Sequence, residues 1–460
     1  MDNSEIGISA LNKVRELRAT RPVAGGKPRF RFVVLSALWV TGMFLYFDRV
    51  NISMAAPFIR DELGLSGVEV GFILSIYYWG YIVGQLMGGV AADRFRIRSW
   101  VIVLYLGWCV TTVVTGFCRT VAQFSVIRTI FGWAEGAVIN PVTKLQNHWV
   151  LPTERGLVNG IQVGSGYMGL VIGMPIVGWL ISILGWRAMF WITGLITLAG
   201  VFLFWLLVYD HPRDHPWISS EEKHLLEEEI AKDRVTFDPS SGRPKELSFR
   251  EGIGILAGNW AYWAICIAFF FIAGIYFTNF SWLPGYLVME RGLSGIDSGF
   301  SLIVPYIGAA LGALLGGYMG DRFNNRSLVI IIAAVLTIPS IAALLAVDGR
   351  MLMIGTLCLM LFFNAAAVSI FVVLLFDLLP AEVIGVALAT MVGIFGGLGG
   401  VVGPLVMGYA YDLSGTFFLG FVSMAAGLVV AAVMLGFVYL YERRIKLEKR
   451  QKLKAAVARN

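Results

Sequence analysis

Runs of apolar residues recur along almost the whole chain, and they constrain the fold more than any other feature. Each run is long enough to cross about 30 Å of hydrocarbon as a helix of roughly 20 residues. The twelve runs lie near 32–58, 69–92, 99–118, 121–149, 155–182, 187–209, 258–288, 296–320, 327–347, 351–378, 383–410 and 415–441. They predict an all-α membrane protein with twelve transmembrane helices.

The composition agrees with this prediction. Of the 460 residues, 57% are hydrophobic and 14% are charged, whereas about a quarter of a soluble chain is charged. The first run is too long for a secretory signal and lacks a cleavage site, so we expect it to remain as the first span. The four cysteines lie in apolar runs without a C-x-x-C motif, which indicates neither a disulfide framework nor a metal site.

The polar segments divide the chain. We predict a basic N-terminus (1–31), a six-helix bundle (32–209), a solvated linker with one short surface helix (210–255), a second six-helix bundle (256–441) and a basic tail (442–460). Lys and Arg concentrate in short loops on the cytoplasmic side of membranes. The basic segments all fall on one side of a twelve-span chain, so both termini are expected in the cytoplasm.

The two bundles resemble each other in sequence. A shift of 228 residues aligns "GQLMGGVAADRFRIRS" (84–99) with "GALLGGYMGDRFNNRS" (312–327), with nine of sixteen positions identical. A looser match at an offset of 230 aligns Gly166, Gly169, Gly173 and Gly178 with Gly396, Gly399, Gly403 and Gly408. Parallel repeats of six helices, related by an axis along the membrane normal, build one large class of transporters.

The segments "GGVAADRFRIR" and "GGYMGDRFNNR" resemble the loop signature of the major facilitator superfamily. Within it, "YFDRVNISMAAP", "RTIFGWAEGAVINP" and "SWLPGYLVMERGLS" are similar to the anion:cation symporter family. That family takes up sugar acids, hexuronates, phthalates and related aromatic carboxylates, usually with protons. The resemblance implies a secondary transporter that imports a small organic anion by alternating access, and not an enzyme.

Four charged residues lie deep inside predicted spans: Asp48, Arg49, Arg128 and Glu135. A charge at a helix centre costs about 2.5 to 3.5 kcal/mol on insertion scales, so such residues face a cavity or one another. Two acids and two bases can simply neutralise each other. Alternatively, a substrate carboxylate that engages an arginine raises the pKa of the paired acid, which makes proton and anion binding mutually favourable.

The resemblance also implies roles for these charges. Arg49 would bind the substrate carboxylate, since a guanidinium can hold a carboxylate with two parallel hydrogen bonds. Asp48 and Glu135 would carry protons, and Arg128 would be the partner of Asp48. The expected substrate-binding residues are Arg49, Tyr46, Tyr81, Tyr167, Asn279, Ser369, Phe371 and Gly393.

The chain departs from the sugar-acid members of the family. Those members tend to have hydrogen-bonding side chains where this chain has Tyr167, Phe371, Val372 and Gly393. Buried hydroxyl groups of a sugar acid that find no partner would each cost about 1 to 3 kcal/mol. An aromatic or otherwise apolar carboxylate is therefore slightly favoured over a sugar acid.

The basic loops have two interpretations. Their charges are Asp93, Arg94, Arg98, Asp321, Arg322 and Arg326. They form either a latch that holds the cytoplasmic side closed or a signal that only retains the loops in the cytoplasm. Other functions stay open as well, namely an anion exchanger, a sodium-coupled carrier and a transport-like receptor.

Several motifs are set aside. "GSGYMG" (164–169) has the dinucleotide spacing but lies inside a span, so we expect helix packing. "AGGKP" (24–28) lacks the phosphate-loop pattern, and no cofactor is expected. His211 and His215 are separated by Pro212, which argues for a solvated loop. The expected partners are the anion, protons and the lipid bilayer of a bacterial inner membrane, with no nucleic acid and no second subunit.

Overall fold

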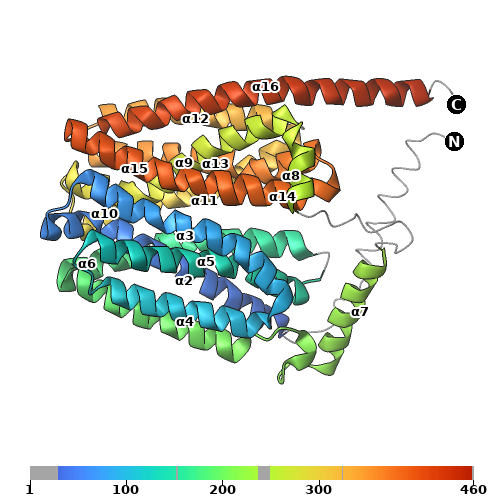
Figure 1. The fold of residues 1–460 in the computed structure, drawn as a ribbon, viewed down its shortest axis with the longest axis horizontal. Helices are drawn as coiled ribbons and strands as arrows, with labels where there is room; N and C mark the ends of the chain where they lie inside the picture. The colour runs from blue at the N-terminus through green and yellow to red at the C-terminus, as the bar shows by residue number, and fades with distance from the viewer. Residues whose placement is uncertain (1–29, 152–153, 237–248, 324, 458–460) are drawn as a thin grey trace.

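The computed structural model describes residues 30–151, 154–236, 249–323 and 325–457, and within these ranges every regular element is helical. Figure 1 shows two helical halves side by side, the N-terminal half from blue to green and the C-terminal half from yellow to red. Helices α7 and α8 lie at one end of the molecule, which we call the linker end, and α10 lies at the opposite end, the far end (Figure 1).

The N-terminal half contains five long helices. They are α2 (Arg31–Leu63), α3 (Gly67–Arg94), α4 (Ile97–Thr115), α5 (Val121–His148) and α6 (Arg155–Leu207). Helix α6 contains both of the spans predicted at 155–182 and 187–209. They separate at Gly185, whose φ of 78° lies in the left-handed region that suits a residue without a Cβ.

The C-terminal half repeats the plan with more interruptions. Its elements are α9 (Trp260–Met289), α10 (Gly295–Ser301), α11 (Ile303–Phe323), α12 (Arg326–Ala346), α13 (Arg350–Leu378), α14 (Ile384–Leu388), the π-helix η5 (Ala389–Gly396), α15 (Gly397–Ser414) and α16 (Phe418–Val457). Helix α16 continues beyond the predicted end of the last span. Its tail is rich in Glu, Lys, Leu and Arg, which are good helix formers.

Ten helical segments in the described part of the chain are long and apolar enough to cross a membrane. Helix α6 is one of the ten, although it contains two predicted spans. Helix α5 is not among them because Arg128, Glu135 and Lys144 lower its hydropathy. The ten segments contain eleven of the predicted spans, and α5 is the twelfth.

The linker is more structured than predicted. It contains η2 (Pro212–Asp214), α7 (Ser220–Thr236) and α8 (Phe249–Ala257), and a further short helix, η4 (Ala381–Val383), lies at the same end. The prediction of one short surface helix therefore missed α8. Glu222 in α7 accepts hydrogen bonds from the backbone N–H groups of Phe30 (2.9 Å) and Arg31 (3.3 Å), so α7 caps the start of α2.

The two linker histidines are not simply solvated. His215 is fully buried and packs against the rings of Phe30 and Tyr209, both 4.6 Å away between ring centroids. The solvated-loop prediction was therefore wrong for His215, and burial lowers the pKa of its imidazole. His211 stacks on His148 with 4.4 Å between centroids.

The sequence repeat is also a repeat in packing. A Cβ atom added to Gly88 in α3 would lie 2.6 Å from the carbonyl oxygen of Ala137 in α5. At the equivalent position, a Cβ atom added to Gly316 in α11 would also lie 2.6 Å from a carbonyl oxygen, that of Ala366 in α13. In both halves, glycine allows the two backbones to approach more closely than any side chain would permit.

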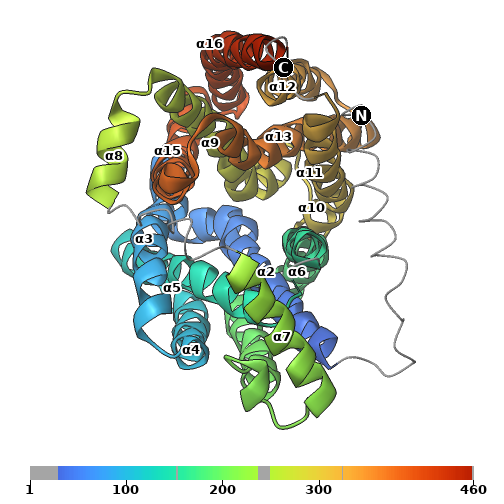
Figure 2. The same cartoon turned by 90° about the vertical axis from the view of Figure 1, so that its right-hand side faces the viewer.

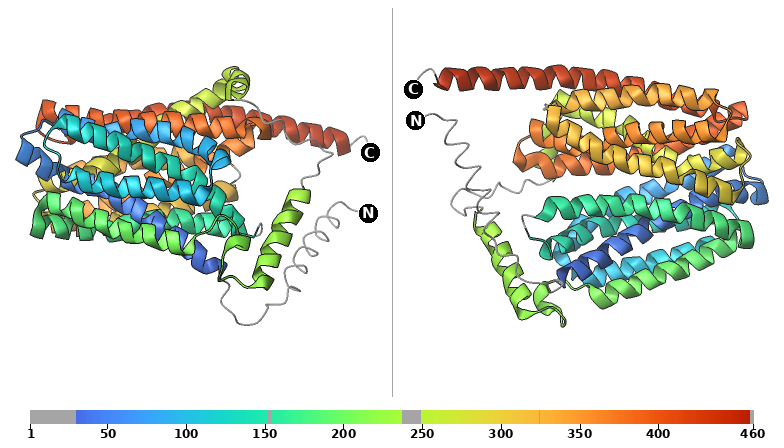
Figure 3. Two further views of the ribbon diagram at one scale, coloured as in Figure 1. Left: turned by 60° about the horizontal axis from the view of Figure 1, so that its bottom comes forward. Right: turned by 180° about the vertical axis from the view of Figure 1, so that it is seen from behind.

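The two halves meet at the far end. Gly408 of α15 contacts Gly67 of α3, and Gly178 of α6 contacts Gly295 of α10. Asp412 of α15 accepts hydrogen bonds from the backbone N–H groups of Gly67 (2.6 Å) and Val68 (2.7 Å). Figures 2 and 3 show the same arrangement, with α10 beside α6 and α15 beside α3. We call these five residues, Gly67, Gly178, Gly295, Gly408 and Asp412, the far-end contact.

Candidate functional site

The central charges of the N-terminal half lie on α2 and α5. Arg49 forms an ion pair with Glu135 and donates a hydrogen bond to the hydroxyl of Tyr77 (2.8 Å). The side chain of Arg49 is 8% exposed and that of Glu135 is fully buried. Because the pair is removed from bulk water, its attraction is strong and breaking it leaves a buried charge unpaired.

Three tyrosines surround the guanidinium of Arg49. Its Cζ atom lies 5.1 Å from the ring centroid of Tyr46, 5.5 Å from that of Tyr77 and 5.7 Å from that of Tyr81. Aromatic faces attract cations at such distances, most strongly where water is excluded. Tyr77 and Tyr81 can both reach Arg49 because residues four apart share one face of a helix.

Asp48 has other partners than the resemblance implied. It accepts hydrogen bonds from Thr197 Oγ1 (2.7 Å) and Asn51 Nδ2 (2.9 Å). The guanidinium of Arg128 lies over the ring of Tyr77, 5.0 Å from its centroid. Among the described side chains, no ion pair joins Arg128 to Asp48. Neutral donors hold the carboxylate and the guanidinium of Arg128 rests on an aromatic face, so Arg128 acts on Asp48 through its charge and not through a direct bond; their functional partnership stays a prediction.

A cavity of about 180 Å³ lies on the linker-end side of Arg49. Three amide side chains, Gln146, Asn159 and Gln162, contribute polar groups to it. The full lining comprises Leu38, Gly42, Leu45, Tyr46, Arg49, Tyr81, Tyr105, Val138, Ile139, Val142, Thr143, Gln146, Asn159 and Gln162. The cavity thus has one buried cation and several hydrogen-bonding groups, which suits a polar anion.

Comparison with known proteins identifies the family. The family model of the Major Facilitator Superfamily matches residues 38–307 and 297–459. The chain belongs to the major facilitator superfamily. It is therefore a multi-pass membrane transporter and not an enzyme, and the predicted fold class, two parallel six-helix repeats, is confirmed.

Curated relatives within the superfamily carry organic acids. The chain is 28% identical over 405 residues to the D-galactonate transporter of Escherichia coli O6:H1, covering 84% of this chain and 91% of the relative. It is 28% identical over 423 residues to the probable sulfoacetate transporter of Cupriavidus necator, covering 88% and 92%. The probable galactarate/D-glucarate transporter of Escherichia coli K12 is 28% identical over 415 residues, covering 84% and 88%. These similarities support the predicted relationship to anion:cation symporters.

Solved structures share the superfamily fold. A bacterial homologue of the human lysosomal transporter Spinster, in an inward-facing and unoccupied conformation, matches with a TM-score of 0.72 at 17% identity, covering 91% of this chain and 98% of that chain. The D-xylose–proton symporter matches with a TM-score of 0.65 at 16% identity, covering 89% and 97%. At these identities the likeness concerns the fold alone.

The structure separates the expected substrate-binding residues of this transporter into two groups. Tyr46, Arg49 and Tyr81 line the cavity, and Tyr167 lies near Tyr46. The residues expected from the C-terminal half, Asn279, Ser369, Phe371 and Gly393, are not part of its lining.

Three of these residues, Phe371, Ser369 and Gly393, contact other groups of the protein instead. Phe371 is fully buried and packs edge-to-face on Phe269, 5.1 Å between centroids. Ser369 donates a hydrogen bond to the carbonyl of its own helix at Ala366 (3.0 Å). Gly393 lies in the π-helix η5, where an added Cβ would be 3.0 Å from Gln85 Oε1 of α3.

Asn279 differs from its neighbours. It is 1% exposed, and neither atom of its amide has a hydrogen-bond partner among the described residues. A buried amide without partners is unfavourable by about 1 to 3 kcal/mol. The side-chain amide of Asn279 can therefore form hydrogen bonds with a bound molecule, or with protein groups that approach it in another conformation.

Sequence reasoning missed several residues of the site. Tyr77 binds Arg49, while Asn51 and Thr197 hold Asp48, and Asn51 also donates to Thr193 Oγ1 (3.0 Å). Signals for them existed in the sequence. Asn51 follows Asp48 by three residues, and Thr193 and Thr197 share a helical face, as Tyr77 and Tyr81 do.

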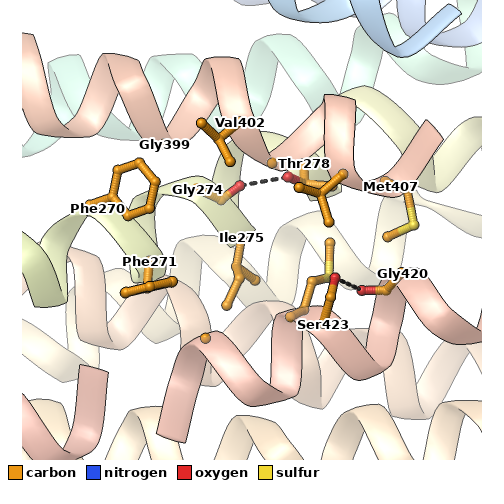
Figure 4. Close-up of a pocket in the computed structure, with 14 residues that line it drawn as sticks. Phe270, Phe271, Gly274, Ile275, Thr278, Gly399, Val402, Met407, Gly420 and Ser423 are labelled. Atoms are coloured by element: carbon orange, nitrogen blue, oxygen red, sulfur yellow. Dashed lines mark hydrogen bonds between the residues drawn. The ribbon is translucent and has the colours of Figure 1, made fainter. Parts of the chain in front are cut away.

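A second cavity, of about 120 Å³, lies between α9, α15 and α16 in the C-terminal half. Figure 4 shows Thr278 and Ser423 at its walls with their hydroxyl groups directed to backbone oxygens. Thr278 donates to the carbonyl of Gly274 and Ser423 to that of Gly420, each at 2.7 Å. The hydroxyls are thus engaged within their own helices, and the remaining lining is apolar, so this cavity does not suit an anion.

The loop charges predicted as a latch have different partners in the two halves. Arg326 forms an ion pair with Asp377 (2.6 Å), whereas Arg98 donates to the carbonyl of Trp205 and lies over the ring of Tyr209. Arg94 and Arg322 are exposed. The side chains of Asp93 and Asp321 lie outside the described residues, and the latch stays a prediction.

Proposed function

We propose that this transporter imports a small organic anion together with protons, by alternating access of two six-helix bundles around Arg49. The observation that carries the proposal is the buried Arg49–Glu135 pair at the wall of a cavity lined by amides and tyrosines. A cation held at that depth is costly in a membrane protein, so it marks a path for substrates or ions.

In this proposal, the Arg49–Glu135 ion pair couples proton binding to anion binding. While Glu135 is ionised, it occupies the positive charge of Arg49 and competes with an incoming anion. Protonation of Glu135 releases the guanidinium, whose planar N–H groups can then hold a carboxylate. Because the coupling is reciprocal, a bound anion also favours the proton on Glu135. Asp48 is the second proposed proton carrier, held by Thr197 and Asn51.

The packing supports an inward-facing state. The far-end contact holds the two halves together, while the cavity lies on the linker-end side of Arg49. We assign the linker end to the cytoplasm of a bacterium, with both termini on that side, because the basic loops lie there. The transporter is proposed to work as a monomer in the inner membrane.

A sugar acid is the first candidate substrate. Gln146, Asn159 and Gln162 offer hydrogen bonds to hydroxyl groups on the cavity wall, and relatives at 28% identity are transporters of D-galactonate and, by description, of galactarate and D-glucarate. An aromatic carboxylate is the second candidate. It is favoured by the rings of Tyr46 and Tyr81, which line the cavity beside Arg49.

Reconstituted protein tests the proposal. Purified transporter in proteoliposomes is given D-galactonate or benzoate outside while the external pH is recorded. Proton symport alkalinises the outside with one of the two anions, and Arg49→Ala abolishes the signal. Arg119→Ala, which removes an exposed arginine far from the cavity, is the matched control and leaves the signal intact.

The alternative carriers give different results. If a preloaded anion exchanges with labelled anion outside and no proton moves, the protein is an exchanger and the proposed coupling is wrong. A requirement for sodium in the same assay indicates a sodium-coupled carrier.

A further inference from the structure

The three amide side chains in the lining of the cavity beside Arg49 differ in how far their hydrogen bonds are already formed. Gln146 Nε2 donates to Asn159 Oδ1 at 3.0 Å, so these two amides hold each other. The third amide, that of Gln162, has a buried Oε1 with no hydrogen-bond partner among the described residues. Of these three side chains, Gln162 is therefore the one that still needs a partner.

A glycine of α2 makes room for the amide of Gln162. A Cβ atom added to Gly42 would lie 2.7 Å from Gln162 Nε2, which is closer than a side chain can approach. Ser165 fixes the same stretch of α6, since its hydroxyl donates to the backbone carbonyl of Gln162 (2.7 Å). Gly42 and Gln162 both line the cavity, so the amide lies against the backbone of α2 at the cavity wall.

Contacts between α2 and α6 show where Gln162 lies relative to the charged part of the site. Gly42 of α2 is adjacent to Gln162, and the ring of Tyr46, one turn later in α2, is adjacent to Gly166, one turn later in α6. The two helices therefore run in the same direction. Because α2 begins at the linker end, Gln162 lies about one turn closer to that end than the ring of Tyr46 does.

The guanidinium of Arg49 lies beside the ring of Tyr46. Its Cζ atom is 5.1 Å from the centroid of that ring, in keeping with the tilt of helical side chains toward the N-terminus of their helix. One helical turn, about 5 Å along the axis, therefore separates the cation from the amide of Gln162. A ligand that contacts both groups must carry two polar ends with several atoms between them.

We propose that Gln162 selects hydroxylated acids: the carboxylate of the ligand binds Arg49, and a hydroxyl several carbons away binds the amide of Gln162. An amide and a hydroxyl group each donate and accept, so they match in either orientation of the amide. An acid without that hydroxyl leaves the amide without a partner, which is unfavourable in a buried site. The inference rests on the proposed function, and it favours a linear sugar acid over an aromatic carboxylate.

The same arrangement gives the ligand a direction in the cavity. Its carboxylate lies at Arg49, and its hydroxylated chain extends toward the linker end, where Gln146 and Asn159 line the wall. The bond between these two amides uses one donor and one acceptor, and each amide keeps further hydrogen-bonding capacity for other hydroxyl groups. Gln162 lies between this pair and the cation, so it contacts the middle of the chain.

The test compares D-galactonate with hexanoate, two straight-chain acids of equal carbon number that differ in their hydroxyl groups. The full-length protein in neutral detergent is titrated with each acid, and the rise in its unfolding temperature gives the half-saturating concentration. We expect D-galactonate to saturate at a concentration about tenfold lower than hexanoate, since one to two neutral hydrogen bonds are worth such a factor. Binding measured in this way requires neither transport nor proton movement.

Variants assign the effect to the amide. Gln162→Leu should raise the half-saturating concentration of D-galactonate about tenfold and leave that of hexanoate unchanged. Gly42→Ala keeps the amide in the chain but occupies its place, so it should weaken the binding of D-galactonate in the same direction. The controls keep the wild-type response: Gly160→Ala has open space for its methyl group, and Gln123→Leu removes an exposed amide at the start of α5.

The outcomes distinguish this inference from the proposed function. If D-galactonate has no advantage over hexanoate, or if Gln162→Leu weakens both acids equally, the role of Gln162 is wrong. The anion site still stands in that case, provided that hexanoate stabilises the wild type and not Arg49→Ala. If neither acid stabilises the wild type, both the role of Gln162 and the proposed anion site are wrong.

Discussion

At the scale of single residues, the site depends on which groups contact the buried guanidinium of Arg49. Arg49 contacts Glu135 and Tyr77 directly, and the rings of Tyr46 and Tyr81 close around it. Because these tyrosines stay around the guanidinium, a substrate carboxylate can replace Glu135 without leaving Arg49 unpartnered.

Glu135→Gln tests this exchange. The amide keeps the shape of the side chain but cannot ionise, so Arg49 loses its competing carboxylate at every pH. We expect proton movement to disappear and anion exchange to persist. The half-saturating anion concentration of the variant should not depend on pH.

The measurement is labelled-anion counterflow across a pH series, beside the proton signal. Glu69→Gln removes an exposed acid of the far end and is the control. Proton-coupled uptake that survives Glu135→Gln would show that another acid, with Asp48 the first candidate, carries the proton.

At the scale of helices, the repeat in sequence becomes a repeat in backbone contacts. Gly88 packs against α5, and Gly316 packs against α13 in the same way. A Cβ atom added to either glycine would lie 2.6 Å from a carbonyl oxygen of the neighbouring helix. The next glycines along the chain, Gly89 and Gly317, have room, with nothing closer than 3.8 Å. One glycine of each pair is therefore required by packing and the other is not.

Gly88→Ala should destabilise the protein. The added methyl group would push α3 and α5 apart, and overpacking of this kind costs about 1 to 3 kcal/mol. Gly89→Ala is the matched control and should be neutral or slightly stabilising, because alanine favours helix by about 1 kcal/mol over glycine. Unfolding temperatures in detergent compare the two, and equal values would contradict the packing assigned to Gly88.

Much of the helix level follows from the sequence alone. The run lengths predict all twelve spans, and two of the three glycines of "GSGYMG" pack closely as expected, Gly166 against Tyr46 and Gly169 against Met43, whereas Gly164 has open space beside it. The break predicted between residues 182 and 187 is present at Gly185, whereas the π-helix η5 was not predictable. The π-helix depends on how neighbouring helices hold a glycine-rich segment, and no local pattern encodes that.

At the scale of the whole molecule, the far-end contact joins the two halves at one end. Gly67 and Gly295 are equivalent under the shift of 228 residues, and each contacts a glycine of the opposite half. Only one of these two contacts is reinforced by an acid, Asp412, which caps the start of α3. A carboxylate at a helix N-terminus is stabilised by the unpaired N–H groups and the helix dipole.

Asp412→Ala should therefore favour opening of the far end. Loss of two hydrogen bonds to a charged acceptor shifts the equilibrium by about tenfold or more toward the outward-facing state. Spin labels at the exposed residues Asp61 and Thr416, one in each half, report the separation of the two halves. The control, Asp348→Ala, removes another exposed acid of the same end and should leave the distance between the labels unchanged. An unchanged distance distribution in Asp412→Ala would contradict the role of the cap.

The sequence by itself determined the number of spans, the two repeats, the family resemblance and the identity of the buried charges. These follow from local rules, because a backbone in hydrocarbon must satisfy its own hydrogen bonds within each helix. Tertiary structure alone decided that Arg49 pairs directly with Glu135, that Tyr77, Thr197 and Asn51 bond to these charged side chains, and that Asp412 bonds to the other half at the far end. These contacts join distant parts of the chain, and the rotation and closeness of packed helices set which side chains meet.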